Sequence, residues 1–368
     1  MSNYEAIERK KRLQYPLEKE ISSYIVGQKY PINSVSNAIR RKLNGWSDPN
    51  HPLVFLFLGS SGVGKTELAK TLSKVLYKND KNKFIRIDMS EFQHKHEVSK
   101  FIGSPPGYVG YEQGGQLTKK LKENPNAIVL LDEVEKAHND VLTIMLQLFD
   151  EGRITDGKGE TIECKDAIFI MTSNLAQTEI GDEAELLRKE ASIHIDKQQN
   201  MELNDSNEEE IGMNLSKQFI EDTVQPILKS HFGRDEFLGR INEILYFLPF
   251  NERELKELTT KELNKWKNIA KTRHNIDINW DDSLINVLKD GYNFRYGARS
   301  LQHEVEKIII NKLAKMHEEG KIKDGSNVNL TVNMDNNNIK IEYIDSNDNN
   351  DSNIDFSSLI KPLPLKMT

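Results

Sequence analysis

A glycine-rich segment, Gly59–Thr66 (GSSGVGKT), has the residue types and spacing that bind phosphate groups. Glycines let the backbone curl so that its N–H groups face an anion, while Lys65 can reach β- and γ-phosphate oxygens and Thr66 can ligate Mg²⁺. A purely structural glycine turn is the alternative, but an apolar strand before the segment and a helix after it favour phosphate binding. The predicted nucleotide contacts are Gly59, Ser60, Ser61, Gly62, Val63, Gly64, Lys65 and Thr66.

Two carboxylates follow the apolar run Ile128–Leu131. Asp132 is predicted to hold a metal at the end of this strand, and Glu133 to polarise an attacking water. Acidic residues also begin helices, so the pair alone is a weak signal. Combined with the phosphate-binding segment it becomes a strong one. A third apolar run ends in Thr172-Ser173-Asn174, where the Asn174 amide can orient that water or contact the γ-phosphate.

Short runs rich in Val, Ile, Leu and Phe must position these residues, and helical patterns lie between the runs. We predict strands at Leu53–Leu58, Ala127–Leu131 and Ala167–Met171, with a fourth candidate at Phe84–Ile87. Strands that alternate with helices and are apolar throughout predict an α/β fold with a doubly wound, mostly parallel sheet. In such a sheet the carboxyl ends of the strands meet at one crevice, where ligands bind.

The net charge of −7 comes from one segment. Residues 177–216 hold eleven acidic and three basic residues, which leaves the rest of the chain near +1. We expect this segment to be a flexible acidic insert, because it has few aromatic residues to bury. A near-neutral remainder, without a basic stripe and interleaved aromatics, argues against a nucleic-acid partner.

The composition also bounds the architecture. A single cysteine, Cys164, excludes an intrachain disulfide and a cysteine-based zinc cage. The longest apolar run, Leu53–Leu58, is too short to span a bilayer, so no membrane association is expected. We divide the chain into an N-terminal linker (1–14), a large domain (15–249), a small C-terminal α+β domain (250–344) and a disordered tail (345–368). The small domain is predicted from helices at Glu252–Thr272, Asp282–Asp290 and Ser300–Glu319 and strands at Asn275–Trp280, Asn327–Val332 and Ile339–Tyr343.

From Tyr15 to about Tyr343 the sequence resembles the nucleotide-binding module of the Clp-type AAA+ unfoldases, which have a P-loop NTPase fold. It is most similar to the second ring of ClpB and to the single-ring mitochondrial homologue of animals. The resemblance rests on Ile25–Gln28 (IVGQ), Asn37–Arg41 (NAIRR), Asp88–Phe92 (DMSEF), Ile102–Thr118 (IGSPPGYVGYEQGGQLT), Asp132–His138 (DEVEKAH), Gly152–Gly159 (GRITDGKG), Phe237–Glu243 (FLGRINE) and Tyr296–Arg299 (YGAR).

This resemblance implies ATP and Mg²⁺ as ligands, a hexameric ring, and roles for four residues. Val26 resembles part of the adenine-binding strip, and Asn174 matches the sensor-1 residue. Arg299 matches a sensor-2 arginine, and Arg240 matches the arginine finger that reaches the next subunit's site. An arginine there is physically sensible, because charge spreads over the γ-phosphoryl oxygens in the transition state. Spacing alone leaves open that Arg240 and Arg299 form surface ion pairs.

Tyr108 and Val109, flanked by Gly107 and Gly110, resemble the family's axial pore loop. An aromatic ring beside a branched aliphatic side chain can grip any extended polypeptide, and the glycines permit the loop to move. A buried hairpin tyrosine is the alternative. Gly152–Gly159 resembles a second loop around the same channel.

The resemblance therefore implies an ATP hydrolase that threads misfolded or aggregated polypeptides through a hexameric ring pore. Three alternatives stay open: the same motor feeding a peptidase, a nucleic-acid motor, and a nucleotide-dependent scaffold without turnover. A peptidase partner is not expected, because Ile211-Gly212-Met213 departs from the usual docking tripeptide. The family suggests a mitochondrial location, whereas the lack of a targeting segment leaves a cytoplasmic one open. Lacking the upstream ankyrin repeats of its single-ring relatives, the chain is expected to be a shortened form.

Overall fold

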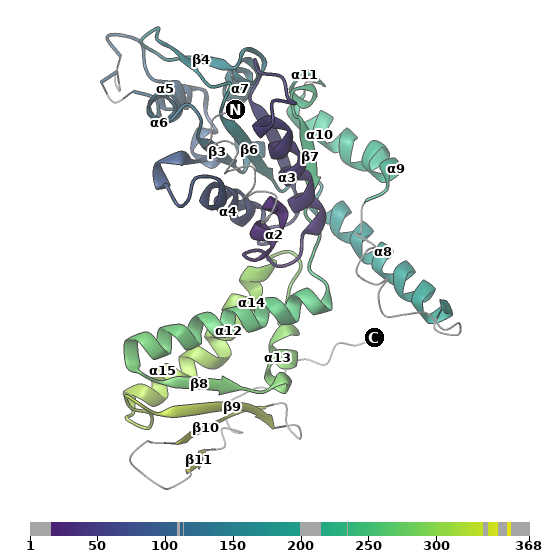
Figure 1. The fold of residues 1–368 in the computed structure, drawn as a ribbon, viewed down its shortest axis with the longest axis vertical. Coiled ribbons are helices and arrows are strands. Elements are labelled where there is room, and N and C mark those ends of the chain that lie inside the picture. The colour runs from purple at the N-terminus through teal and green to yellow at the C-terminus, as the bar shows by residue number, and fades with distance from the viewer. Residues whose placement is uncertain are drawn as a thin grey trace. The chain divides into compact units, whose positions relative to one another are not determined.

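The computed structural model describes residues 16–108, 111–112, 114–198, 215–233, 235–333, 338–344 and 352–354. The chain forms two compact units, Met1–Pro249 and Phe250–Thr368. Figure 1 shows the helices and strands of each unit. In the described parts of the chain, no helix combines the length and the apolar character that crossing a membrane requires.

The first unit is built on a five-stranded sheet in the order β2-β3-β6-β1-β7. Every pairing in it is parallel, which confirms the predicted doubly wound sheet. The four expected strands are present within a residue or two of their predicted ends. The fifth, β7, escaped prediction because it is short and begins with a charged residue. The strands are β1 (Leu53–Leu58), β2 (Phe84–Asp88), β3 (Ile128–Asp132), β6 (Ile168–Ser173) and β7 (Glu243–Tyr246).

Two apolar cores cover the two faces of this sheet, because successive side chains of a strand point to opposite faces. Along β1, Val54 and Leu56 belong to one core, while Phe55 and Phe57 belong to the other. The core around Phe55 and Phe57 contains side chains of α2 (Leu17–Ser22), α3 (Lys29–Leu43) and α4 (Lys65–Leu76). The opposite core contains side chains of α5 (Val98–Ile102), α6 (Gln116–Glu123), α7 (Asn139–Glu151), α10 (Gln225–Phe232) and α11 (Asp235–Gly239).

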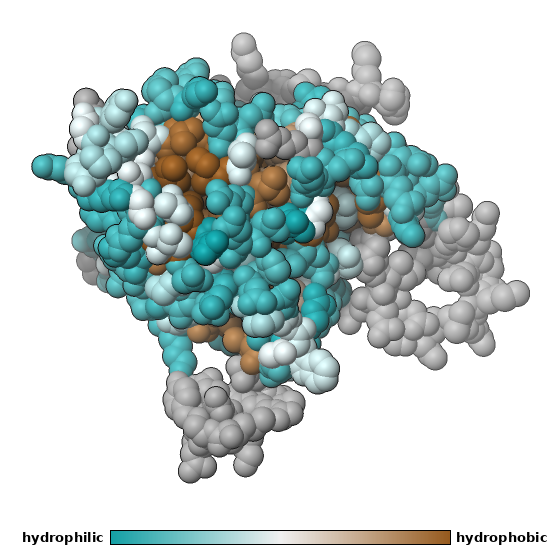
Figure 2. Space-filling view, turned by 90° about the horizontal axis from the view of Figure 1, so that it is seen from above, coloured by the Kyte–Doolittle hydropathy of each residue, from teal (hydrophilic) through white to brown (hydrophobic). Residues whose placement is uncertain are grey.

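Short elements complete the unit. They are the 3-10 turns η1 (Lys81–Lys83), η2 (Met89–Phe92), η3 (Lys95–Glu97) and η4 (Val134–Lys136), the hairpin strands β4 (Arg153–Thr155) and β5 (Thr161–Glu163), helix α9 (Lys217–Phe219) and the π-helix η5 (Ile220–Val224). Figure 2 views the molecule from the end at which β4 and α5 lie in Figure 1. This face is largely hydrophilic, with one large hydrophobic area and smaller ones apart from it.

The expectation of a flexible insert over 177–216 is wrong for its first part. Helix α8 covers Gln177–Gln198 and buries Ile180 and Ala184. These two side chains are one helical turn apart, so they share a face that packs into the core, which the acidic composition concealed. Residues 199–214, including Ile211-Gly212-Met213, and the expected linker 1–14 lie outside the described residues.

The second unit packs helices on a four-stranded sheet in the order β11-β10-β9-β8. The β8–β9 pairing is parallel and the other two are antiparallel, so the sheet is mixed and mainly antiparallel, in agreement with the predicted α+β domain. In Figure 1, α12 and α15 lie along this sheet. The elements are α12 (Glu252–His274), β8 (Asp277–Trp280), α13 (Asp282–Lys289), α14 (Ala298–Val305), the π-helix η6 (Glu306–Ile310), α15 (Asn311–Glu318), β9 (Asn327–Asn333), β10 (Asn338–Ile344) and β11 (Ser352–Ile354).

Two expectations for this unit need correction. The single helix predicted over Ser300–Glu319 contains the π-helical turn η6 between α14 and α15. The tail expected to be disordered from residue 345 contributes the strand β11, which pairs with Ile341–Tyr343 of β10. Pairing with a neighbouring strand satisfies backbone groups regardless of composition, so a polar segment can still join a sheet edge.

Candidate functional site

The loop between β1 and α4 has the curled backbone that its glycines predict. Gly59, Gly62 and Gly64 have φ values of 145°, 71° and 108°, which L-residues rarely adopt. A Cβ on Gly59 would overlap the carbonyl oxygen of Phe247 at the end of β7. The loop therefore depends on glycine both for its turn and for its contact with the edge strand. It leads directly into α4, whose first turn offers backbone N–H groups to an anion.

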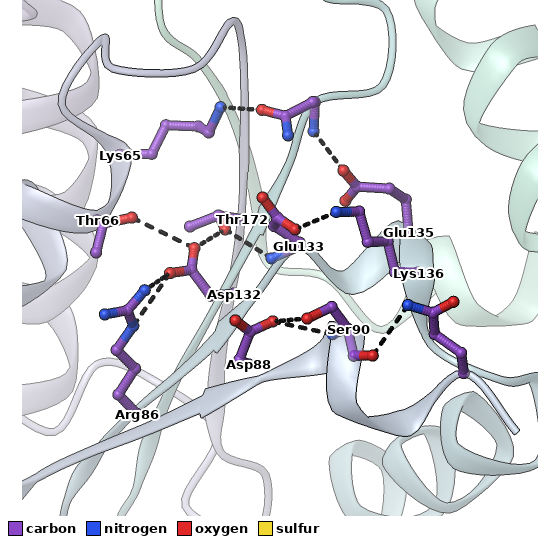
Figure 3. A network of polar contacts seen from close by, with 12 residues as sticks. Lys65, Thr66, Arg86, Asp88, Ser90, Asp132, Glu133, Glu135, Lys136 and Thr172 are labelled. Atoms are coloured by element: carbon purple, nitrogen blue, oxygen red, sulfur yellow. Dashed lines mark hydrogen bonds and ion pairs between the residues drawn. The ribbon is translucent and has the colours of Figure 1, made fainter. Parts of the chain in front are cut away.

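Lys65, the first residue of α4, is buried with 7% of its surface exposed. Its Nζ donates to the Ser60 carbonyl oxygen at 2.8 Å, to the Gly59 carbonyl oxygen, and to Asn174 Oδ1 at 2.9 Å. Asn174 directly follows β6, so this hydrogen bond joins the phosphate-binding loop to the end of a second strand (Figure 3). The structure thus brings together two residues that lie 109 positions apart in the sequence.

Asp132, at the end of β3, is the centre of the polar network in Figure 3. Its Oδ1 accepts from Thr172 Oγ1 at 2.5 Å and from Thr66 Oγ1 at 3.3 Å. Hydroxyl and carboxylate oxygens are the hard ligands that Mg²⁺ prefers. The chemistry and the spacing of Thr66 and Asp132 therefore fit the predicted metal site.

Arg86 is also part of this site, although no sequence motif pointed to it. Its Nε and Nη2 donate to Asp132 Oδ2 at 3.1 and 2.7 Å, so Asp132 carries partners on both oxygens. Half of the Arg86 side chain is exposed, whereas 11% of the Asp132 side chain is. The contact arises because β2 pairs in register with β3, Asp88 lying opposite Asp132. Only knowledge of the strand order could have revealed it.

Glu133 has a left-handed backbone, with φ of 59°, immediately after β3. Its backbone N–H donates to Thr172 Oγ1 at 3.1 Å, and its carboxylate accepts from Lys136 Nζ at 2.5 Å. This hydrogen bond raises the pKa of Lys136, so the lysine remains a cation. Nearby, a hydrogen bond from the Ser90 hydroxyl lowers the pKa of Asp88. The Glu133 carboxylate, the predicted catalytic base, is thus paired with the Lys136 ammonium in this conformation.

Glu135 is a second residue that sequence reasoning missed. Its Oε1 accepts from the backbone N–H of Asn174 at 3.2 Å, while its Oε2 is buried without a hydrogen bond. The backbone carbonyl of Glu135 lies 2.8 Å from His231 Nε2 of α10. Glu135 thus fixes the segment that presents Asn174 to Lys65. The acidic DEVEK sequence was the available signal, but acidic residues in a turn are too common to single one out.

The remaining predicted site residues come from other segments of the chain. Val26 is buried in the segment before α3, which is tied to the end of β7 by a 2.7 Å hydrogen bond from Gln28 Nε2 to the Leu248 carbonyl. Arg240 follows α11 and forms an ion pair with Asp150 at 2.8 Å, both side chains being about half exposed. Arg299 is exposed on the first turn of α14, in the second unit. Their nucleotide contacts remain predictions.

The predicted pore-loop residue Tyr108 is 71% exposed, so the alternative of a buried hairpin tyrosine is wrong. It sits in a turn after Gly107, whose φ of 86° again requires glycine, and its backbone N–H donates to the Pro105 carbonyl at 3.2 Å. Val109 lies outside the described residues.

Three glycines, Gly103, Gly115 and Gly157, allow close backbone contact between the hairpin β4–β5 and the two ends of the predicted pore loop. Gly157 N donates to the Ile102 carbonyl at 3.0 Å, and a Cβ on Gly157 would overlap the Gly103 backbone. A Cβ on Gly115 would overlap the backbone of Ile102 and Gly103. The predicted second loop is therefore packed against the base of the first, backbone to backbone.

Each of the two units matches a family model of its own. Residues 50–244 match the AAA domain (Cdc48 subfamily), and residues 250–330 match the C-terminal, D2-small domain of ClpB protein.

Curated proteins give a consistent picture. The chain is 58% identical to the "Mitochondrial disaggregase" of Rattus norvegicus and of Homo sapiens over 327 residues, which is 88% of this chain and 48% and 46% of theirs. It is 40% identical to "Chaperone protein ClpB" of Chlamydia muridarum over 321 residues, covering 87% of this chain and 34% of that protein. The chain thus spans about half the length of the mitochondrial relatives it matches.

Proposed function

This chain belongs to the AAA family, with a ClpB-type D2-small domain after its AAA domain, and we propose that it hydrolyses Mg-ATP to unfold polypeptides. The substrates proposed are misfolded or aggregated proteins, drawn through the pore of a hexameric ring. The observation that carries this proposal is the contact of Lys65, Asn174 and Glu135 beside the Thr66–Asp132 pair. A mitochondrial location is proposed from the names of the relatives.

The residues of the site divide the work of hydrolysis. The α4 N-terminus and Lys65 bind the β- and γ-phosphates, because backbone N–H groups and an ammonium both favour anions. Thr66 and Asp132 would hold Mg²⁺, which neutralises charge on the phosphate oxygens. Lys65 now donates to carbonyl oxygens and to Asn174 Oδ1. Phosphate oxygens are stronger acceptors for an ammonium than carbonyl or amide oxygens are. We therefore expect Lys65 to exchange these hydrogen bonds for hydrogen bonds to phosphate when nucleotide binds.

Glu133 is proposed to accept a proton from the attacking water. Its ion pair with Lys136 must open first, because Glu133 Oε2 already accepts a hydrogen bond from Lys136 Nζ at 2.5 Å. Both side chains are partly exposed, so the exchange costs little free energy. Glu135, by holding the Asn174 backbone, keeps the Asn174 amide aimed at the γ-phosphate position.

The catalytic assignment is tested with Glu133→Gln. The amide keeps the size of the side chain but cannot take a proton, so we expect ATP binding to be retained and turnover to fall by orders of magnitude. Binding is measured by fluorescent-nucleotide titration and turnover by phosphate release. Turnover at the parental rate would show that Glu133 is not the base.

Threading is tested at Tyr108, which is exposed and lies outside the Lys65–Asp132 network. Tyr108→Ala removes the ring proposed to grip substrate, whereas Tyr108→Phe retains it and serves as the matched control. We expect the Ala variant to keep basal ATP hydrolysis but lose reactivation of an aggregated reporter enzyme, and the Phe variant to keep both. Equal reactivation by the Ala variant would contradict the pore-loop assignment.

A further inference from the structure

Three side chains of metal-ligating type converge at one end of the second unit. His274 is the last residue of α12, His317 lies in the last turn of α15, and Asp324 lies in the connection from α15 to β9. One ligand atom from each lies within 4.8 Å of the others. His317 Nε2 is 3.9 Å from Asp324 Oδ1, and the two imidazole centroids are 4.8 Å apart.

These separations are close to what a shared metal ion requires. Zn²⁺ binds imidazole nitrogen and carboxylate oxygen at about 2.0–2.2 Å, so two ligand atoms of one tetrahedral ion lie about 3.4 Å apart. The His317–Asp324 distance of 3.9 Å is about 0.5 Å longer than this, a difference that small side-chain rotations can close. His274 is exposed, so a small rotation of its side chain can bring its imidazole nitrogen to the same ion.

The backbone around the three residues is held firmly. Lys323 N donates to Ser326 Oγ at 2.9 Å and Ser326 N donates to the Lys323 carbonyl at 3.0 Å, which closes the turn that carries Asp324. Met316 and Ile322, which flank this end of α15, are each 2% exposed and belong to the apolar core. Little backbone entropy is therefore lost when ligands on this scaffold bind a metal.

The electrostatics also favour a cation. Both histidines lie at the carboxyl end of a helix, where the aligned peptide dipoles and unpaired carbonyl groups give a negative potential. The neighbouring Lys321 does not cancel this field, because its ammonium is paired with Glu319 at 2.7 Å. Both imidazoles also line an apolar cavity of about 510 Å³ in the same unit.

We propose that His274, His317 and Asp324 form a binding site for Zn²⁺ or a similar divalent transition metal. Two imidazoles select such an ion over Mg²⁺, which prefers oxygen ligands and is the ion proposed for the ATP site. Three protein ligands leave a fourth position for water. The bound metal ties the end of α12 to the end of α15 and to the turn before β9, and so stabilises the second unit.

The test adds Zn²⁺ to the whole chain without nucleotide and in excess Mg²⁺, which occupies oxygen-only sites. Calorimetry should find one bound equivalent, and thermal unfolding should shift to higher temperature. His317→Ala and Asp324→Asn should each weaken binding at least about 10- to 100-fold, the cost seen even for supporting groups of metal sites. Asp324→Asn is the safer of the two for folding, because the Asp324 side chain is 79% exposed.

Two controls make the result specific. His303→Ala removes an exposed histidine of α14 in the same unit and should leave Zn²⁺ binding unchanged. The double variant His94→Ala/His96→Ala removes the stacked pair of the first unit, whose centroids are 5.6 Å apart, and should also leave it unchanged. The proposal is overturned if the parent chain binds no Zn²⁺, or if binding survives in the His317 and Asp324 variants.

Discussion

Replacing Arg86 by glutamine tests whether this side chain neutralises Asp132 in the nucleotide-free protein. Asp132 is 11% exposed at its side chain and accepts two hydrogen bonds from Arg86 on one oxygen. The variant keeps a polar side chain on β2 but removes the positive charge. The buried carboxylate should then be left with hydroxyl partners alone, Thr66 and Thr172.

The expected loss of stability follows from the burial of the two groups. Breaking a fully buried ion pair costs about 3–5 kcal/mol, because one charge stays buried and unpaired. Arg86 is half exposed, so water already screens the pair and can partly replace it. We therefore expect a loss of about 1–2 kcal/mol in the free energy of unfolding, between the values for exposed and fully buried ion pairs. For a unit of this size, that corresponds to a decrease of roughly 2–8 °C in Tm.

Thermal unfolding is measured without ligand, with ADP and a chelator, and with Mg-ADP. A metal cation near Asp132 would supply the missing charge, so the deficit of the variant should shrink with Mg-ADP only. Arg41→Gln is the matched control, because Arg41 forms an exposed ion pair with Glu243 at 2.9 Å in the same unit. It should change Tm little in all three conditions. A deficit that is equal with and without Mg-ADP, or absent in both, would refute the reasoning.

Two further predictions concern Gly157 and Cys164 of the first unit. Gly157→Ala should destabilise the protein by about 1–3 kcal/mol, because its Cβ overlaps the Gly103 backbone, whereas Gly239→Ala, with open space at its Cβ, should be nearly neutral in the same denaturant titration. Burial raises the pKa of Cys164 to about 12, so its thiol should react with a disulfide reagent at pH 8 only after unfolding. Because the unfolded thiol ionises first, this group should also lower the free energy of unfolding as pH rises from about 9 toward 12; rapid modification of the native protein would contradict both expectations.

Much of the candidate site could be predicted from the sequence because its chemistry is encoded locally. The glycines of Gly59–Thr66 adopt the positive φ values that only a glycine-rich loop tolerates, and the segment enters a helix as expected. Asp132 and Glu133 end a strand whose apolar run was visible without any structure. Residues within a few positions of one another share a backbone conformation, so spacing carries the information.

The tertiary structure alone decided which distant residues meet. Arg86 reaches Asp132 because β2 is paired with β3, and Glu135 reaches Asn174 because β3 is paired with β6. The sheet order β2-β3-β6-β1-β7 sets both contacts, and strand order depends on packing between segments far apart in the chain. The burial of Ile180 by α8 was hidden for the same reason, since a composition average does not reveal which face of a helix meets the core.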